Sequence, residues 1–135
     1  MPSINDVCKD IMETVDGTLG CGVVDLNTGL LLGVAHKVAY FTQSYMDAVA
    51  AASVDMVRGK TVKAVESLLS NNRGTKLENS IKEIQIATDN TYHFITTIPA
   101  KPNAMVILVT NTKVNLGMGW AGLKNNLDKI APLCP

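Results

Sequence analysis

Two glycine-containing segments have residue types that can bind phosphate groups. Gly59-Lys60-Thr61 matches the end of a phosphate-binding loop, in which backbone N–H groups and a lysine hold the phosphates. The complete motif needs a glycine at position 54, where this chain has Val54. The segment also lies inside a helical pattern, so its N–H groups are used within the helix. We therefore interpret Gly59 as a helix-interior glycine that admits a close neighbour or a slight bend.

The second segment, residues 117–122, matches the dinucleotide-binding pattern G-x-G-x-x-G. In that motif the loop directly follows a strand, and a second strand with an acidic residue follows the helix. Here the preceding strand is expected to end near Val109 or Thr110, and too little chain remains for a second strand. We interpret these glycines as positions where the last helix lies close to the sheet.

The remaining reactive side chains form no pattern of catalysis or metal binding. His36 and His93 lie at expected strand positions, without a Cys, Asp or Glu at metal-ligand spacing. No serine has a G-x-S-x-G context, and the acidic residues are scattered singly. Cys8, Cys21 and Cys134 are widely spaced among apolar residues, which predicts buried thiols in a reducing compartment. We therefore expect a protein that is not an enzyme and uses neither cofactor nor metal.

Composition narrows the class of partner. The 135 residues are expected to form a single domain, residues 1–135. Hydrophobic residues make up 47% of the chain and charged residues 18%, against about 25% charged in a typical soluble domain, which favours an oligomer. Twelve basic residues balance twelve acidic ones, so nucleic acid is not an expected partner. Without a signal peptide or a long apolar run, we expect a cytoplasmic protein that does not insert into membranes.

The element expected to organise the chain is one long helix over residues 44–72. Ser44 and Asp47 have the spacing of a capping box. Apolar side chains cover more of this helix than one packing contact requires, so we expect a second contact, most simply with the same helix of another copy. The main stripe has the width of a helix packed on a core and is broadened on both sides: it contains Met46, Ala50, Val54, Val57, Ala64, Val65 and Leu68, flanked by Val49, Met56, Val62 and Leu69.

The other elements are expected in the order helix, two strands, the long helix, three strands, helix. Hairpin-joined strands predict an α+β domain with a five-stranded, mainly antiparallel sheet flanked by helices. Ser3 is expected to cap the first helix, Gly29 to turn the first hairpin, and Asn115 and Pro132 to bound the last helix. The strands are expected at residues 19–26, 30–36, 84–86, 92–98 and 104–109, with Pro99 and Pro102 in the connector before the last.

With these elements the chain resembles the roadblock/LC7 family, small proteins related to dynein light chains and to bacterial regulators of Ras-like GTPases. The resemblance rests on the element order, the hairpin over residues 23–30, the Ala-rich second helix, and the strand at 104–109 before a glycine-rich last helix. It implies a profilin-like roadblock sandwich. It also implies a homodimer in which the third strand pairs antiparallel with its copy and the second helices lie side by side.

The expected dimer interface and partner surface follow from this resemblance. Family members dock a small GTPase on the paired-helix face and carry no catalytic residue, so we expect a non-enzymatic scaffold that binds and modulates or tethers a Ras-like GTPase. Arg58 and Arg73 are the candidates for arginines that face the partner. The expected interface consists of Ala50, Val54, Val57, Ile84, Gln85 and Ile86.

An alternative function is small-molecule sensing, because sheets of this α+β type can enclose a pocket against their helices. Tyr92, His93 and Trp120 would then be the polar and aromatic lining. In the leading interpretation Trp120 is instead a core residue, because it belongs to the apolar stripe of the last helix.

Overall fold

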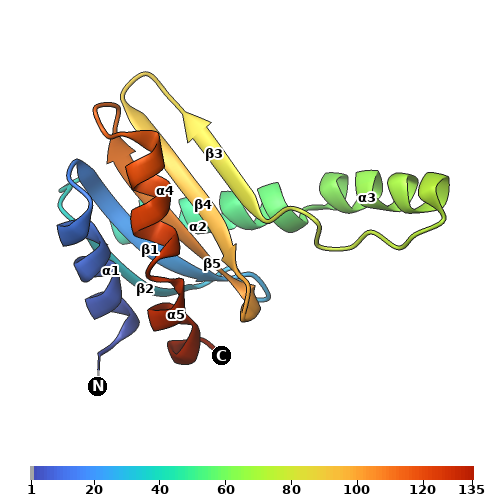
Figure 1. Ribbon diagram of the computed structural model, residues 1–135, viewed down its shortest axis with the longest axis horizontal. Coiled ribbons are helices and arrows are strands. Elements are labelled where there is room, and N and C mark those ends of the chain that lie inside the picture. The colour runs from blue at the N-terminus through green and yellow to red at the C-terminus, as the bar shows by residue number, and fades with distance from the viewer. Residues whose placement is uncertain (1) are drawn as a thin grey trace.

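A five-stranded antiparallel sheet with helices on both faces forms the body of the molecule (Figure 1), in a computed structural model that describes residues 2–135. The strand order is β2-β1-β5-β4-β3, and every neighbouring pair is antiparallel. The predicted α+β fold and antiparallel sheet are confirmed. The strands are β1 (Thr18–Asp25), β2 (Leu31–His36), β3 (Glu83–Ala87), β4 (Thr91–Ile98) and β5 (Lys101–Asn111).

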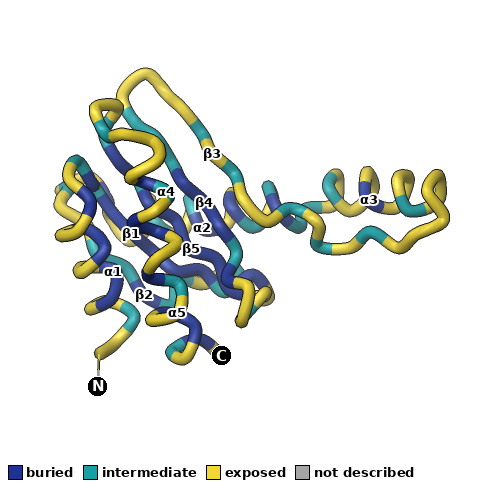
Figure 2. The backbone as a smooth tube through the Cα atoms, viewed as in Figure 1, coloured by how far each residue is buried: buried dark blue, intermediate teal, exposed yellow. Residues whose placement is uncertain are grey.

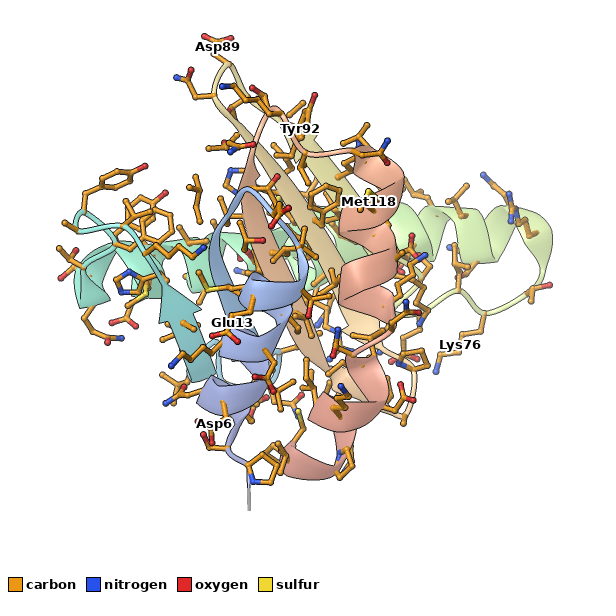
Figure 3. The ribbon with its side chains drawn as sticks, turned by 60° about the vertical axis from the view of Figure 1, so that its left-hand side comes forward. Asp6, Glu13, Lys76, Asp89, Tyr92 and Met118 are labelled. Carbon is orange, nitrogen blue, oxygen red and sulfur yellow. The ribbon has the colours of Figure 1, made fainter. Side chains whose placement is uncertain are left out.

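Three helices cover one face of the sheet: α1 (Ile4–Thr14), α4 (Leu116–Lys124) and α5 (Leu127–Ile130), followed by the 3-10 turn η1 (Ala131–Leu133). The predicted Ser3 cap is confirmed, since Ser3 Oγ accepts from the Asp6 N–H and the Asp6 carboxylate accepts from the Ser3 N–H. Asp6 accordingly lies at the N-terminal end of α1 (Figure 3). Ile11 of α1, Phe94 of β4 and Leu123 of α4 are fully buried in this layer.

The three cysteines are free and buried in this same layer, as predicted. A hydrogen bond with the Cys8 thiol and burial both raise the pKa of the Cys21 thiol. Since the thiolate is the reactive form, Cys21 is an inert apolar side chain in this setting.

The opposite face is covered by α2 (Gln43–Arg58), and here the prediction of one helix over residues 44–72 is wrong. Gly59 has φ −67° and ψ 167°, which ends α2, and α3 (Lys60–Arg73) follows it directly. A Cβ atom at position 59 would lie 2.5 Å from the Asp55 carbonyl oxygen, so this break needs a glycine. The capping residue also differs from the predicted Ser44: the Thr42 hydroxyl accepts from the Tyr45 N–H at 3.2 Å.

Beyond the break, α3 and the return segment 74–82 project away from the body (Figure 1); we call residues 60–82 the arm. Most of α3 is exposed, as the yellow tube in Figure 2 shows. The predicted core stripe is therefore wrong in its second half, because Ala64, Val65 and Leu68 lie on an exposed helix rather than on the sheet. The C-cap that ends helix α3 is Gly74, which has the left-handed φ of +67° that favours glycine.

The last helix is also shorter than predicted. The Asn115 cap is confirmed, with its Oδ1 accepting from the Met118 N–H at 3.1 Å, but α4 ends at Lys124 and the chain turns before α5. Asn126 is buried at this turn and donates its Nδ2–H to the Gly122 carbonyl at 2.6 Å.

Pro102 is predicted from the sequence to lie in the connector before the last strand. In the structure it lies near the start of β5 instead. No helix within residues 2–135 has both the length and the apolar character to cross a membrane.

Candidate interaction surface

The two edges of the sheet differ in how they are covered. At the β2 edge, α1 packs against the strand, and Asn5 Oδ1 accepts a hydrogen bond from the Val34 backbone N–H at 2.8 Å. At the other end of the sheet β3 has a single strand neighbour, β4. An uncovered strand edge is a template for pairing with another chain. The edge that can accept a further strand is therefore β3.

Side-chain contacts from α4 fix the position of this edge strand. Gln85 Oε1 accepts from the Trp120 indole N–H at 2.7 Å, and Glu83 forms an ion pair with Lys124 at 2.6 Å. The Lys124 Nζ also lies 5.2 Å from the Trp120 ring centroid. These contacts lie on the α4 face, which leaves the backbone edge of β3 unobstructed by them. The strand turns into β4 at Asp89, the tip of the hairpin in Figure 3.

The arm carries an apolar strip of side chains that its own protomer does not cover. Val65 is 51% exposed, Leu68 64% and Leu69 37%, and Val62 beside them is half-buried. We call these four residues the α3 stripe. A shallow hollow connects the stripe to Ile81, which precedes β3 and is half-buried against the apolar layer between α2 and the sheet. The stripe therefore lies close to the open edge of the sheet.

The interface residues predicted on the long helix have different environments. Ala50 and Val57 are 1% and 2% exposed, because the inward face of α2 packs on the protomer's own sheet. They are therefore core residues of a single copy, and this part of the predicted interface does not lie at the surface. Val54 is half-buried at the border of the same layer.

The strand residues of the predicted interface lie along β3. Ile84 and Ile86 are half-buried on the α2 side, whereas Gln85 is exposed on the α4 side. The surplus apolar surface inferred from the sequence therefore exists, but α3 carries it rather than α2. The helical period places the apolar residues of 44–72 on one stripe. The break at Gly59 divides that stripe into a part on α2 that is covered by the sheet and a part on α3 that is exposed.

The two arginines occupy separate sites. The Arg58 guanidinium donates to Asn103 Oδ1 at 2.8 Å and to the Pro102 carbonyl at 2.7 Å, which ties α2 to the start of β5. Arg73 is exposed in the last turn of α3, at the far end of the arm. Arg58 is thus already engaged, and Arg73 is the freely exposed member of the pair.

The glycines of residues 117–122 pack the last helix closely, in agreement with their interpretation from the sequence. A Cβ atom at position 119 would lie 2.7 Å from the Phe94 ring, and one at position 122 would overlap Val15. Lys60 is exposed at the start of α3, which follows a helix rather than a strand. A phosphate-binding loop connects a strand to the helix that follows it, and neither segment does so: residues 59–61 lie at the junction of two helices, and residues 117–122 lie within α4.

The predicted small-molecule lining is wrong, because its three residues lie on opposite faces of the sheet. Neighbouring strand residues point to alternate faces. Tyr92 and Trp120 therefore both lie on the α1/α4 side, where Trp120 contacts Phe94 edge-on at a centroid distance of 5.2 Å. His93 points to the α2 side. These three side chains cannot surround one ligand.

Solved structures of other proteins share the α+β fold described above. No protein-family model and no curated protein sequence matches the chain. Among solved structures, Myxococcus xanthus MglB has a TM-score of 0.71 at 15% identity, covering 96% of this chain and 86% of that one. A roadblock/LC7 domain from Streptomyces avermitilis has a TM-score of 0.71 at 12% identity and covers 97% of each chain. MglC from Myxococcus xanthus has a TM-score of 0.58 at 16% identity, covering 95% and 96%. The element order, the sheet topology and these matches together show that the chain has the roadblock/LC7 fold.

Proposed function

We propose that this protein is a non-enzymatic homodimeric module that binds a small Ras-like GTPase and modulates or tethers it. The observation that carries the proposal is the exposed α3 stripe beside the open edge of β3. A strand edge and an apolar strip so close together are both covered if a second copy approaches this side of the molecule.

A two-fold axis beside β3 satisfies both features at once. Antiparallel pairing of β3 with its copy extends the sheet, and a symmetric contact uses the same surface on both copies. The arm of each protomer then crosses toward the other copy, where Val65 and Leu69 become buried. Val65 and Leu69 are 51% and 37% exposed in one copy, so their burial contributes only part of the about 1.5–3 kcal/mol that full burial of such a side chain contributes. The blocked β2 edge leaves β3 as the strand that pairs.

A GTPase partner is supported by the likeness to roadblock/LC7 proteins, which include bacterial regulators of Ras-like GTPases. The outer face of α2 suits a docking surface because Ala51 and Ala52 are exposed and allow a partner to approach the helix backbone closely. Arg73, exposed on the arm, is the basic residue placed to contact a bound partner.

Two experiments test the proposal, the first on the dimer and the second on the GTPase partner. Sedimentation velocity of the full chain at micromolar concentration is expected to show a dimer, and Val65→Glu is expected to dissociate it. Ser67→Glu places the same charge on the opposite side of α3 and is expected to leave the dimer intact. A monomeric wild type, or equal effects of both substitutions, contradicts the dimer.

The second experiment mixes the dimer with the Ras-like GTPases of its own genome, each loaded with GDP or a GTP analogue. Co-elution with at least one GTPase, or a changed rate of GTP hydrolysis, is the expected result. The absence of binding to every one of them in both nucleotide states contradicts the GTPase assignment.

A further inference from the structure

A cavity of about 50 Å³ lies between the sheet and the N-terminal half of α2, away from both the arm and the β3 edge. Its floor includes Gly20 and Gly22 of β1, and its roof includes Phe41 together with Met46 and Val49. The proposed dimer and GTPase surfaces use none of these residues. The cavity is therefore available for a separate role.

The missing side chain at Gly22 of β1 leaves this space open, whereas the Phe41 ring fills the space above Gly20, where a Cβ atom would lie 3.0 Å from it. Alternate residues of β1 point to the α2 side, so Gly20 and Gly22 face α2, whereas Val23 packs in the layer beneath α1. A Cβ atom at position 22 would meet only ordinary contacts, with Leu31 at 3.4 Å nearest. The position thus has room for a side chain that the sequence does not supply.

The side chains of the lining are apolar apart from the rings of two histidines and the Tyr45 hydroxyl. His36 Nδ1 is engaged, since it accepts from the Val38 N–H at 3.3 Å. His93 Nε2 shares a hydrogen bond of 3.0 Å with the Thr91 hydroxyl, and its Nδ1 has no hydrogen-bond partner within residues 2–135. Burial lowers the pKa of His93, which favours the neutral ring at pH 7. His93 Nδ1 is therefore a polar atom available to a ligand, and the lining contains no Asp, Glu, Lys or Arg.

An aromatic cluster forms one side of the entrance. Phe41 stacks on Tyr45 with a centroid distance of 5.1 Å and is itself buried. Tyr45 lines the cavity and is 41% exposed, so the cavity reaches solvent beside it. A small molecule can therefore enter without disruption of the core.

We propose that this cavity is a binding site for a small uncharged molecule with a branched aliphatic end of about four carbon atoms. The volume corresponds to a few water-sized spheres, which suits such a group. The apolar lining excludes a charged ligand because its desolvation would not be compensated. The free nitrogen of His93 provides the partner for one hydroxyl or carbonyl group.

Titration of the full-length protein with isobutanol, followed by NMR, tests this assignment. We expect saturable shifts centred on Met46, Val49 and His93, with a dissociation constant on the order of millimolar for so small a ligand. Isobutyrate has the same branched end with a carboxylate, and we expect binding at least tenfold weaker. Shifts that never saturate, or equal binding of both compounds, overturn the proposal.

Filling the cavity supplies the matched controls. Val49→Phe places a ring in the cavity and is expected to weaken isobutanol binding at least tenfold, whereas Ala48→Phe adds the same ring at an exposed neighbour and is expected to change it less than twofold. If Val49→Phe does not fold, Gly22→Ala serves the same purpose, because its methyl group fits. Undiminished binding to a folded cavity-filling variant overturns the proposal. The dimer and GTPase tests use other residues, so either result stands independently.

Discussion

Ser80 donates two hydrogen bonds to one oxygen of Glu66, from its backbone N–H at 2.7 Å and from its hydroxyl at 2.5 Å. Glu66 is the buried residue of α3, and Ser80 lies on the segment that returns from the arm to β3. A second contact joins Ser70 Oγ to the Leu77 N–H at 2.6 Å. Polar contacts, rather than a packed core, therefore hold the return segment against α3 in one copy.

Removal of the serine hydroxyl should loosen the arm without unfolding the body. Ser80→Ala deletes one hydrogen bond to a charged group, which costs roughly 1.5–3 kcal/mol. Because the arm shares few contacts with the sheet, the loss is expected as local opening. Amide hydrogen exchange of residues 60–82 should accelerate by at least about tenfold while β5 keeps its protection. Glu78→Ala is the control, since its ion pair with Lys76 is exposed and such pairs contribute little.

The same contact predicts a pH dependence confined to the arm. The hydrogen bonds from Ser80 hold the pKa of Glu66 below its ordinary value. A carboxyl group whose pKa is lowered by folding stabilises the folded state at neutral pH. This stabilisation is lost as the pH falls through the pKa of the folded state. Protection of residues 60–82, corrected for intrinsic exchange rates, should be constant from pH 7 to about pH 5 and fall below about pH 4. Glu66→Gln should abolish this dependence, and an identical profile in that variant would refute its assignment to Glu66.

Close packing of α4 predicts opposite outcomes for two glycines of one helix. Gly119→Ala forces a methyl group to within 2.7 Å of the Phe94 ring, and overpacking of a core costs about 1–3 kcal/mol. Gly117→Ala meets only the Asn115 side chain, at 3.2 Å. Urea unfolding should show a loss of stability for the first variant and no loss for the second. Equal midpoints would show that α4 can shift away from the sheet.

The bond between α4 and the edge strand should affect the proposed dimer. Trp120→Phe keeps an aromatic ring against Phe94 but removes the hydrogen bond to Gln85. A hydrogen bond of this kind contributes about 0.5–1.5 kcal/mol, so the dimer dissociation constant should rise about two- to tenfold. Tyr92→Phe is the control, because the Tyr92 hydroxyl has no hydrogen-bond partner in the described part of the chain. Sedimentation equilibrium measures the dimer dissociation constant of both variants. An unchanged constant for Trp120→Phe would show that dimerisation does not depend on this hydrogen bond.

Local signals in the sequence determined much of the fold. The caps at Ser3 and Asn115, the left-handed turns at Gly29 and Gly74, and the buried strand β5 each depend on residues close together in the chain. Such features follow from hydrogen bonds and backbone preferences within a few residues. The order of helices and strands, and with it the roadblock/LC7 fold, could therefore be predicted.

The tertiary structure alone decided which apolar faces are covered. Periodicity placed Val57 and Val65 on one stripe, but packing buries the first and leaves the second exposed beyond the break at Gly59. Likewise, strand alternation separates His93 from Tyr92, and the cavity beside His93 depends on glycines some seventy residues earlier in the chain. Sequence periodicity reports which side chains share a face, whereas burial depends on distant segments that fill the space opposite it.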